Sequence, residues 1–307
     1  MTGRPGGMVH EGVPFADPRG LAAELAGPVS AALAAGEPVI AVLDEDNRAA
    51  LTAAIGSATD AVEFLDPVAV HRLPAFTVAT RWARLSRRAA RPEQRTTVVA
   101  QHMALPGIDA AHWIRLDAAL NVALEGLPIT MLCPCRADAD LDLVRATHPV
   151  LRVDGRSEPS GDLRDPAQLV AQYPPPPPPD LGVPLVDRTF DTAALPALRH
   201  LVAETSTAAG LDPEHVADLV LAVNEIATNS VEHGPGLGRL RMWSTADGFV
   251  AEVYDVGRMG VPFPGMVAPS PSGERGRGLW LASELADVLQ VWSDDTGTIV
   301  RLTVEAG

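Results

Sequence analysis

Three polar residues recur at four-residue steps in the stretch Leu219–Gly234, LVLAVNEIATNSVEHG. Glu225, Asn229 and His233 would lie on one side of an α-helix, each about one turn from the next. An amide oxygen is a hard ligand of the kind that Mg²⁺ prefers, and a carboxylate one turn away can hold or deprotonate a water or a hydroxyl. The same spacing also fits a solvated polar face that ends in a histidine.

A separate apolar stripe predicts the helix that would carry these side chains. Its residues recur at three- and four-residue steps, as on a helix with one face on a core: Val216, Leu219, Val220, Val223, Ile226, Ala227 and Val231. Asp212-Pro213-Glu214 would begin the helix, because it supplies an N-cap, a first-turn proline and an early acid. Gly234 and Gly236 would end it.

A short strand with an acidic end follows. The apolar and β-branched residues of Val250–Val256 predict the strand, which runs into Asp255, Gly257 and Gly260. The strand end is thus an acid followed by two glycines.

Two further glycine segments complete the pattern. Gly276-Arg277-Gly278-Leu279 would open an apolar helix that continues to Leu289, and Gly297-Thr298 lies in a turn between two predicted strands. A helix with E-x-x-x-N, a strand end with D-x-G, a helix start with G-x-G and a late Gly-Thr, in this order, are more specific together than any one of them.

These features resemble the GHKL (Bergerat) ATP-binding fold of histidine kinases, gyrase-type ATPases and heat-shock chaperones. Within it, the sequence is similar to the serine-kinase anti-sigma factors of bacteria, whose helix of the type N-E-x-x-x-N-x-x-x-H corresponds here to Asn224–His233. The resemblance covers residues 183–304. It implies an α+β domain that binds ATP and Mg²⁺.

The resemblance also implies a role for each matching residue. Asn229 would bind the Mg²⁺ that bridges the phosphates, and Glu225 would polarise the attacking hydroxyl or water. Asp255 would accept the exocyclic amine of adenine, Gly257 would let the backbone approach the base, and Thr298 would lie on the adenine side.

The phosphate lid is implied at the start of the last helix. Gly276 and Gly278 would form it, since free N–H groups and the helix dipole favour anions there. Further ATP-binding residues implied by the match are His233, Gly260, Arg277 and Leu279. The family usually has D-x-G-x-G, whereas the second glycine here, Gly260, is one place late.

Composition narrows the class of protein. The chain has 307 residues, 47% of them hydrophobic, and a net charge of −15, which argues against binding to nucleic acid or to anionic membranes. The sequence contains no lysine, so it lacks the lysine of a Walker A loop or of a Schiff-base enzyme. Without a signal peptide or a long apolar run, a cytoplasmic protein is expected.

The region up to residue 154 alternates predicted strands and helices. Such alternation predicts an α/β domain with a mostly parallel sheet covered on both faces. The motifs GEPVIAVLDEDN, LDAALNVAL, MLCPC and ATHPVL resemble the DcmR-type (MEDS) sensory domain, which is similar to a RecA-type sheet without the phosphate loop. The turn Leu43–Asn47 carries three acids here, which would repel phosphate.

Two cysteines one residue apart, Cys133 and Cys135, lie in this region with several histidines. A disulfide between them has poor geometry. Together with the histidines they fit either a metal or redox sensor or a buried strand end with scattered polar residues. The histidines are His10, His102, His112 and His148.

We therefore expect a DcmR-type sensory domain over 1–154, a Pro-rich linker over 155–182 and a GHKL ATP-binding domain over 183–307. The resemblance implies a sensor-linked anti-sigma factor with serine/threonine kinase activity towards an anti-sigma antagonist, which regulates transcription by switching partners. Its partners would be a sigma factor and that antagonist. Kinases of this type are often dimers, so a homodimer is one expectation. The alternatives are a non-catalytic, ATP-gated binding module and a sensor histidine kinase.

Overall fold

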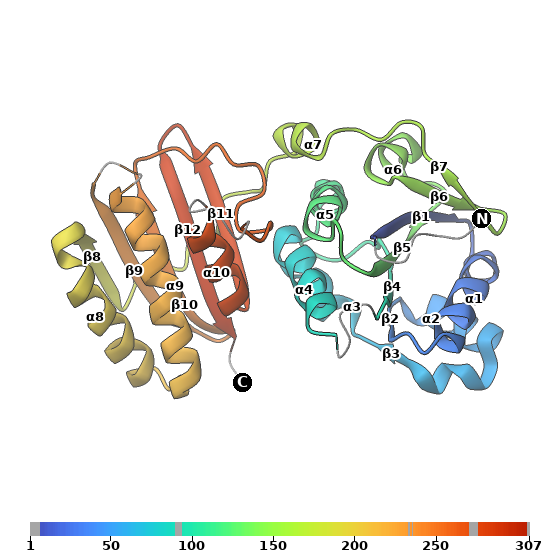
Figure 1. The fold of residues 1–307 in the computed structure, drawn as a ribbon, viewed down its shortest axis with the longest axis horizontal. Helices are drawn as coiled ribbons and strands as arrows, with labels where there is room; N and C mark the ends of the chain where they lie inside the picture. The colour runs from blue at the N-terminus through green and yellow to red at the C-terminus, as the bar shows by residue number, and fades with distance from the viewer. Residues whose placement is uncertain (1–6, 90–93, 233, 235, 270–275, 306–307) are drawn as a thin grey trace. The chain divides into compact units, whose positions relative to one another are not determined.

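The structure, a computed structural model, describes residues 7–89, 94–232, 234, 236–269 and 276–305 of the 307-residue chain. It divides into two compact units, Met1–Pro174 and Pro175–Gly307, which Figure 1 draws as ribbons. Each unit has its own sheet. No helix in the described ranges is long and apolar enough to cross a membrane.

The first unit is built on a seven-stranded sheet with the order β3-β2-β4-β5-β1-β6-β7. Neighbouring strands run parallel except for β6 and β7, so the prediction of a mostly parallel sheet is confirmed. The strands are β1 (Val9–Phe15), β2 (Val39–Val42), β3 (Val62–Phe64), β4 (Thr96–Ala100), β5 (Ile129–Arg136), β6 (Val150–Val153) and β7 (Arg156–Pro159).

Helices cover both faces of this sheet, with α1 and α2 on one side and α4 and α5 on the other (Figure 1). Leu25 of α1 and Leu51 of α2 are fully buried in one core with Leu132 of β5. The helices are α1 (Pro18–Ala34), α2 (Glu45–Ile55), α3 (Pro67–His71), α4 (Ala75–Arg87), α5 (Ala110–Ala123), α6 (Leu141–Thr147) and α7 (Pro166–Gln172), with a 3₁₀ turn η1 (Gly56–Ala61).

The predicted linker over 155–182 differs from the structure in its first part. Residues 156–159 form β7, which pairs antiparallel with β6, and residues 166–172 form α7. Leu169 and Val170 of α7 are buried, so this segment is part of the first unit. The six prolines begin only after it, at Pro174, whose carbonyl accepts a hydrogen bond from Arg115 at 3.3 Å.

The second unit is an α+β domain. Its five strands have the order β11-β12-β10-β9-β8, and every neighbouring pair is antiparallel. Three helices, α8, α9 and α10, lie on one face of the sheet (Figure 1). The elements are β8 (Val186–Phe190), η2 (Thr192–Ala194), α8 (Leu195–Ala208), α9 (Pro213–Glu232), β9 (Gly238–Thr245), β10 (Gly248–Asp255), α10 (Arg277–Leu285), β11 (Val288–Asp294) and β12 (Gly297–Glu305).

A buried ionic cluster lies on the other face of this sheet, because side chains along a strand alternate between faces. The Glu252 carboxylate is 1% exposed and accepts hydrogen bonds from the guanidinium groups of Arg241 and Arg301. Arg301 also donates to the Pro179 carbonyl at 2.7 Å, and the Trp243 indole donates to the Gly182 carbonyl at 3.0 Å. The cluster thereby fixes the chain where it enters the unit.

Candidate functional site

The second unit contains a cavity of about 340 Å³. It is lined by residues of α9, of the segment after β10, of the start of α10 and of β12. The lining residues are Ile226, Asn229, Ser230, Gly234, Asp255, Gly257, Arg258, Met259, Gly260, Val261, Gly276, Leu279, Thr298 and Val300.

Helix α9 forms one wall of this cavity. It begins where predicted, because the Asp212 carboxylate accepts hydrogen bonds from the backbone N–H groups of Glu214 and His215 at 3.0 and 3.1 Å. Its apolar stripe is buried in the core of the unit, whereas Glu225 and Asn229 are only half-buried. Of these two polar residues, Asn229 lines the cavity.

The first turn of α10 packs directly on this polar pair. A Cβ atom added to Gly278 would lie 3.0 Å from Asn229 Nδ2 and 3.1 Å from Glu225 Oε2. Contacts this short are tighter than side chains normally accept, so only glycine fits at this position without displacing one of the two. The structure therefore places Glu225 beside the cavity, against the glycine-rich helix start.

The sheet contributes Asp255 and Thr298, which face each other on neighbouring strands, to the lining of the cavity. Asp255 of β10 lies opposite Thr298 of β12, which in turn lies opposite Ser293 of β11. The Asp255 carboxylate accepts from the Gly257 N–H at 2.7 Å, and the Thr298 hydroxyl donates to the Gly257 carbonyl at 2.9 Å. These bonds fix the turn after β10 and the direction of the carboxylate.

Ser293 extends this network, although sequence reasoning missed it. Its hydroxyl hydrogen-bonds with that of Thr298 at 2.8 Å and accepts from the Met259 N–H at 2.9 Å. A serine near the end of a strand carries no local signal of such a role. Its role could be predicted only from the pairing of β11 with β12, which places Ser293 opposite Thr298.

The structure thus brings most of the predicted residues to one cavity. Those that line it are Asn229, Asp255, Gly257, Gly260, Gly276, Leu279 and Thr298. Glu225 and Gly278 adjoin it, while Arg277 is exposed and is not among the lining residues. His233 and residues 270–275 lie outside the described residues.

Gly276 occupies the N-cap position of α10 with φ 83°, in the left-handed region that favours glycine. The backbone N–H groups of the first turn of α10 therefore begin at the cavity wall.

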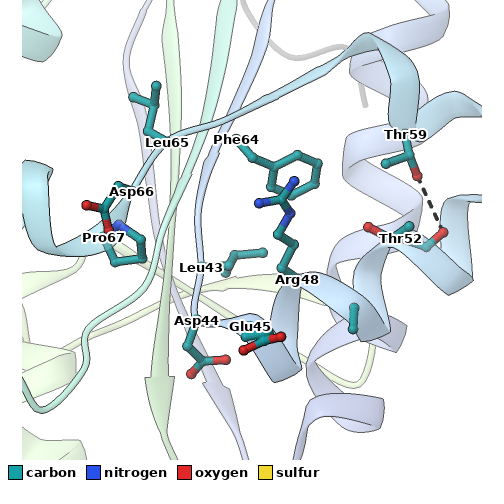
Figure 2. Close-up of a pocket in the computed structure, with 11 residues that line it drawn as sticks. Leu43, Asp44, Glu45, Arg48, Thr52, Thr59, Phe64, Leu65, Asp66 and Pro67 are labelled. Carbon is teal, nitrogen blue, oxygen red and sulfur yellow. Dashed lines mark hydrogen bonds between the residues drawn. The ribbon is translucent and has the colours of Figure 1, made fainter.

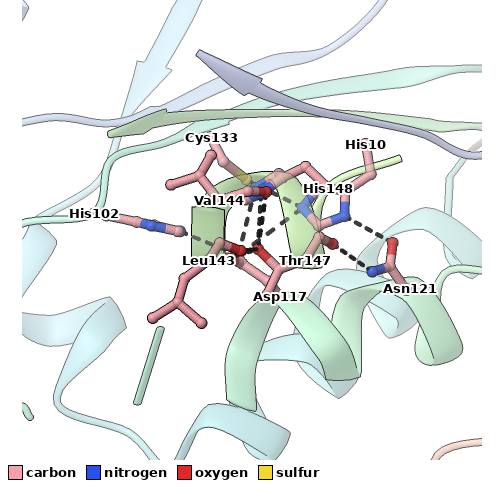
Figure 3. Close-up of polar contacts among 9 residues, drawn as sticks. All are labelled: His10, His102, Asp117, Asn121, Cys133, Leu143, Val144, Thr147 and His148. Atoms are coloured by element: carbon pink, nitrogen blue, oxygen red, sulfur yellow. Dashed lines mark hydrogen bonds and ion pairs between the residues drawn. The ribbon is translucent and has the colours of Figure 1, made fainter. Parts of the chain in front are cut away.

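The first unit contains a second polar constellation, which Figure 3 shows. Asp117 of α5 lies among three histidines. His102 Nε2 is 3.1 Å, His148 Nε2 3.7 Å and His10 Nε2 4.0 Å from Asp117 Oδ1. The Cys133 Sγ atom lies 3.4 Å from His10 Nε2. These groups come from β1, the loop after β4, α5, β5 and the residue after α6.

Burial sets the protonation of this constellation. It lowers the pKa of the His10 imidazole and lowers that of His148 to about 3, so both rings are neutral at pH 7. Burial opposes ionisation of Asp117, but the nearby His102 and His148 hold the pKa of its carboxyl well below the usual range. Burial and the Asp117 charge raise the pKa of the Cys133 thiol.

A further cavity, of about 800 Å³, lies at the end of β2 in the first unit (Figure 2). Three acids line it, Asp44, Glu45 and Asp66, together with Arg48, whose guanidinium lies 4.4 Å from the Phe64 ring centroid. The Asp44 carboxylate caps α2 by accepting from the Asn47 N–H at 2.9 Å. An acidic helix start does not favour phosphate, in agreement with the sequence.

Comparison with known proteins bears on the second unit. Residues 188–304 match the family model of the histidine kinase-like ATPase domain. The match covers less than half of the chain, and it falls on the unit with the five-stranded antiparallel sheet. The C-terminal unit is thus similar to the histidine kinase-like ATPase domain, in agreement with the predicted α+β fold.

No curated protein matches the chain. Among solved structures, the chain is similar to the RsbU and RsbW domains of Rv1364c from Mycobacterium tuberculosis, with 22% identity and a TM-score of 0.29. That similarity covers 40% of this chain and 33% of the other, so it spans about a third of that protein's chain.

Proposed function

We propose that the C-terminal unit binds ATP with Mg²⁺ and transfers the γ-phosphoryl group to a serine or threonine of a partner protein. The observation that supports this most directly is the single cavity that collects Asn229, Asp255 and Thr298 beside the Glu225–Gly278 contact. The match of residues 188–304 to the histidine kinase-like ATPase domain supports the nucleotide class.

Adenine would bind at the sheet wall. The Asp255 carboxylate is oriented by the Gly257 N–H, and its remaining lone pairs can accept the exocyclic amine of adenine. The Thr298 hydroxyl holds the same turn through Gly257. In this proposal Gly257 and Gly260 let the backbone pass close to the base, and Leu279 contributes an apolar wall.

The phosphates would lie between α9 and the start of α10. The backbone N–H groups after Gly276 and the positive end of the helix dipole favour phosphate oxygens, which suits a chain without lysine. The Asn229 side chain lines the cavity and offers an amide oxygen, so it fits as a Mg²⁺ ligand. When bound, Mg²⁺ would neutralise charge on the phosphates.

Glu225 would act on the attacking group. The hydroxyl oxygen of the partner forms a bond to the γ-phosphorus, the bond from that phosphorus to the bridging β–γ oxygen breaks, and ADP leaves. The carboxylate of Glu225 accepts the hydroxyl proton. Its place against Gly278 would bring it close to the terminal phosphate.

We further propose that the chain works as a cytoplasmic, sensor-linked anti-sigma factor that switches between a sigma factor and an antagonist. The resemblance of residues 183–304 supports this role, and the net charge of −15 suits a basic protein partner. In this proposal residues 1–154 of the first unit are a DcmR-type sensory domain with a RecA-like sheet, which selects the state of the kinase.

The test is phosphoryl transfer from γ-labelled ATP with three chains: the wild type, Glu225→Gln, and Glu214→Gln as a control in the first turn of the same helix. We expect the wild type and the control to label serine or threonine on a second protein. Glu225→Gln should bind ATP but lose the labelling.

Two other outcomes would contradict the proposal. ATP binding without any labelling by the wild type would indicate a non-catalytic, ATP-gated module. Acid-labile label on a histidine of the chain itself would indicate a histidine kinase.

A further inference from the structure

We propose that the N-terminal unit binds a divalent transition-metal ion of the zinc class between His10, Asp117, Cys133 and His148. All four residues are buried, and one potential ligand atom from each lies within 4.8 Å of the others. The proposal concerns the first unit alone and does not depend on the ATP-binding role of the second.

The separations within this cluster approach those of a tetrahedral site. Sγ of Cys133 lies 3.4 Å from Nε2 of His10, while Oδ1 of Asp117 lies 3.7 and 4.0 Å from the Nε2 atoms of His148 and His10. Zinc bonds of about 2.0–2.3 Å in a tetrahedron place neighbouring ligand atoms about 3.3–3.8 Å apart. Side-chain movements of a few tenths of an ångström would bring these three pairs into that range, and the most distant of the four atoms, which lie within 4.8 Å of one another, would approach by up to about 1 Å.

The outer hydrogen bonds turn both imidazole rings towards the cluster. His148 Nδ1 lies 2.9 Å from the Val144 carbonyl, which can only accept, so Nδ1 carries the proton in the neutral ring. Asn121 donates from Nδ2 to the Thr147 carbonyl, so its Oδ1 accepts from His10 Nδ1 at 2.9 Å. Both Nε2 atoms then present lone pairs, as metal-binding histidines do.

The cluster contains a polar atom without a partner. Nε2 of His148 is fully buried and has no hydrogen bond among the described residues. It faces Oδ1 of Asp117, which is also an acceptor. Two acceptors held 3.7 Å apart with no proton between them leave a desolvation cost that a cation would remove.

The absence of a side chain at Gly12 of β1 leaves space for the His148 ring. A Cβ added at Gly12 of β1 would lie 3.1 Å from His148 Cγ and 3.0 Å from side-chain carbons of Val144 and Leu151. The glycine therefore leaves room for the ring. On the other side, His102 contacts Asp117 Oδ1, and its side chain is 13% exposed, which gives the cluster a path to solvent.

The donor set selects the class of metal. Thiolate is a soft ligand and imidazole a borderline one, and both suit Zn²⁺ and its neighbours, whereas Mg²⁺ and Ca²⁺ prefer all-oxygen sites. Four protein ligands are typical of a closed, structural zinc site. Because the ligands come from β1, α5, β5 and the segment between α6 and β6, metal binding would stabilise the unit.

The test uses the metal-free full chain and Co²⁺ as a spectroscopic probe, because a thiolate ligand gives Co²⁺ a charge-transfer band in the near ultraviolet. The chain has two cysteines, which provide a matched pair of variants. We expect one equivalent of Co²⁺ and the band in the wild type and in Cys135→Ser. Cys133→Ser should lose the band.

A second variant keeps the test decisive if Cys133→Ser does not fold. Asn121→Ala removes the outer hydrogen bond to His10 and the one that Asn121 donates to the Thr147 carbonyl, but no proposed ligand, and we expect it to weaken Zn²⁺ binding about 10- to 100-fold. Absence of the band from the wild type, its persistence in Cys133→Ser, or equal Zn²⁺ affinity of Asn121→Ala and the wild type would each overturn the proposal. ATP binding, measured on the same samples, reports the second unit independently.

Discussion

Gly278→Ala tests the contact between the start of α10 and the polar pair of α9. The added Cβ would lie 3.0 Å from Asn229 Nδ2 and 3.1 Å from Glu225 Oε2. Both atoms are ends of flexible side chains, so each would move by a few tenths of an ångström rather than force the backbone apart. The substitution therefore acts on the proposed Mg²⁺ ligand and on the proposed base together.

The size of the effect follows from these contacts. Hydrogen bonds to charged groups contribute about 1.5–3 kcal/mol, and displacing two side chains would forfeit part of that. A loss of about 1.4 kcal/mol corresponds to a tenfold weaker affinity for Mg²⁺-ATP. Alanine is also favoured over glycine inside a helix by about 0.5–1 kcal/mol, so the thermal midpoint should not fall.

The assay is isothermal titration with Mg²⁺-ATP, combined with thermal unfolding. Gly27→Ala is the matched control, because Gly27 lies inside α1 and, apart from its own helix backbone and chain neighbours, no described residue has an atom within 4 Å of its added Cβ. We expect the control to bind like the wild type. If Gly278→Ala also binds Mg²⁺-ATP with wild-type affinity, the start of α10 does not face Glu225 and Asn229 in the bound state, and the reasoning is wrong.

Three other predictions follow from contacts in the second unit. Asp255→Asn should weaken ATP binding at least tenfold in a titration, because an amide can present donors to the adenine amine. The control, Asp247→Asn at an exposed position, should bind ATP like the wild type, and equal losses in the two variants would contradict this prediction. Glu252→Gln should lower the free energy of unfolding by about 3–5 kcal/mol in denaturant titrations, because Arg301, which is 5% exposed, would lose its carboxylate partner. A loss under about 1 kcal/mol would refute a stabilising buried ion pair. The hydrogen bond to Asp212 raises the pKa of His215, so this contact stabilises the protein fully below the unfolded pKa of about 6.5 and less as pH rises. The thermal midpoint of Asp212→Asn should therefore fall further below the wild type at pH 5.5 than at pH 8, and an equal gap would count against the ion pair.

The second unit was largely predictable because its signals are local. The apolar stripe and the Asp212 cap of α9 lie within one segment of the chain, and Gly276 and Gly278 predict the start of α10. Because Glu225 and Asn229 are four residues apart in this predicted helix, the sequence also predicts that they lie on one side of it. Ser293 was missed because its role depends on pairing between β11 and β12.

The structure of the first unit was harder to predict where a strand forms only through pairing with a strand distant in the sequence. β1 contains Gly12 and Pro14 and has no clear apolar pattern, yet it lies between β5 and β6 in the sheet. The run of six prolines predicts a linker over 155–182, whose first part instead contains β7 and α7. Their structure comes from pairing with β6 and from the burial of Leu169.

The histidine cluster shows the same limit. The sequence indicates His10, Cys133 and His148 as candidate ligands, whereas no motif around Asp117 distinguishes it from other acids on helices. Only the packing of α5 on the sheet brings its carboxylate to the three histidines.

The most direct test of the central claim is the affinity for ATP with and without Mg²⁺, in the wild type, Asn229→Ala and Asn224→Ala. Asn224 lies on the same helix but bonds to Arg199 at 2.9 Å and does not line the cavity. We predict that Mg²⁺ strengthens ATP binding in the wild type and in Asn224→Ala but not in Asn229→Ala. If the wild type does not bind ATP, or if Asn229→Ala keeps the full Mg²⁺ effect, the cavity is not the nucleotide site proposed for this chain.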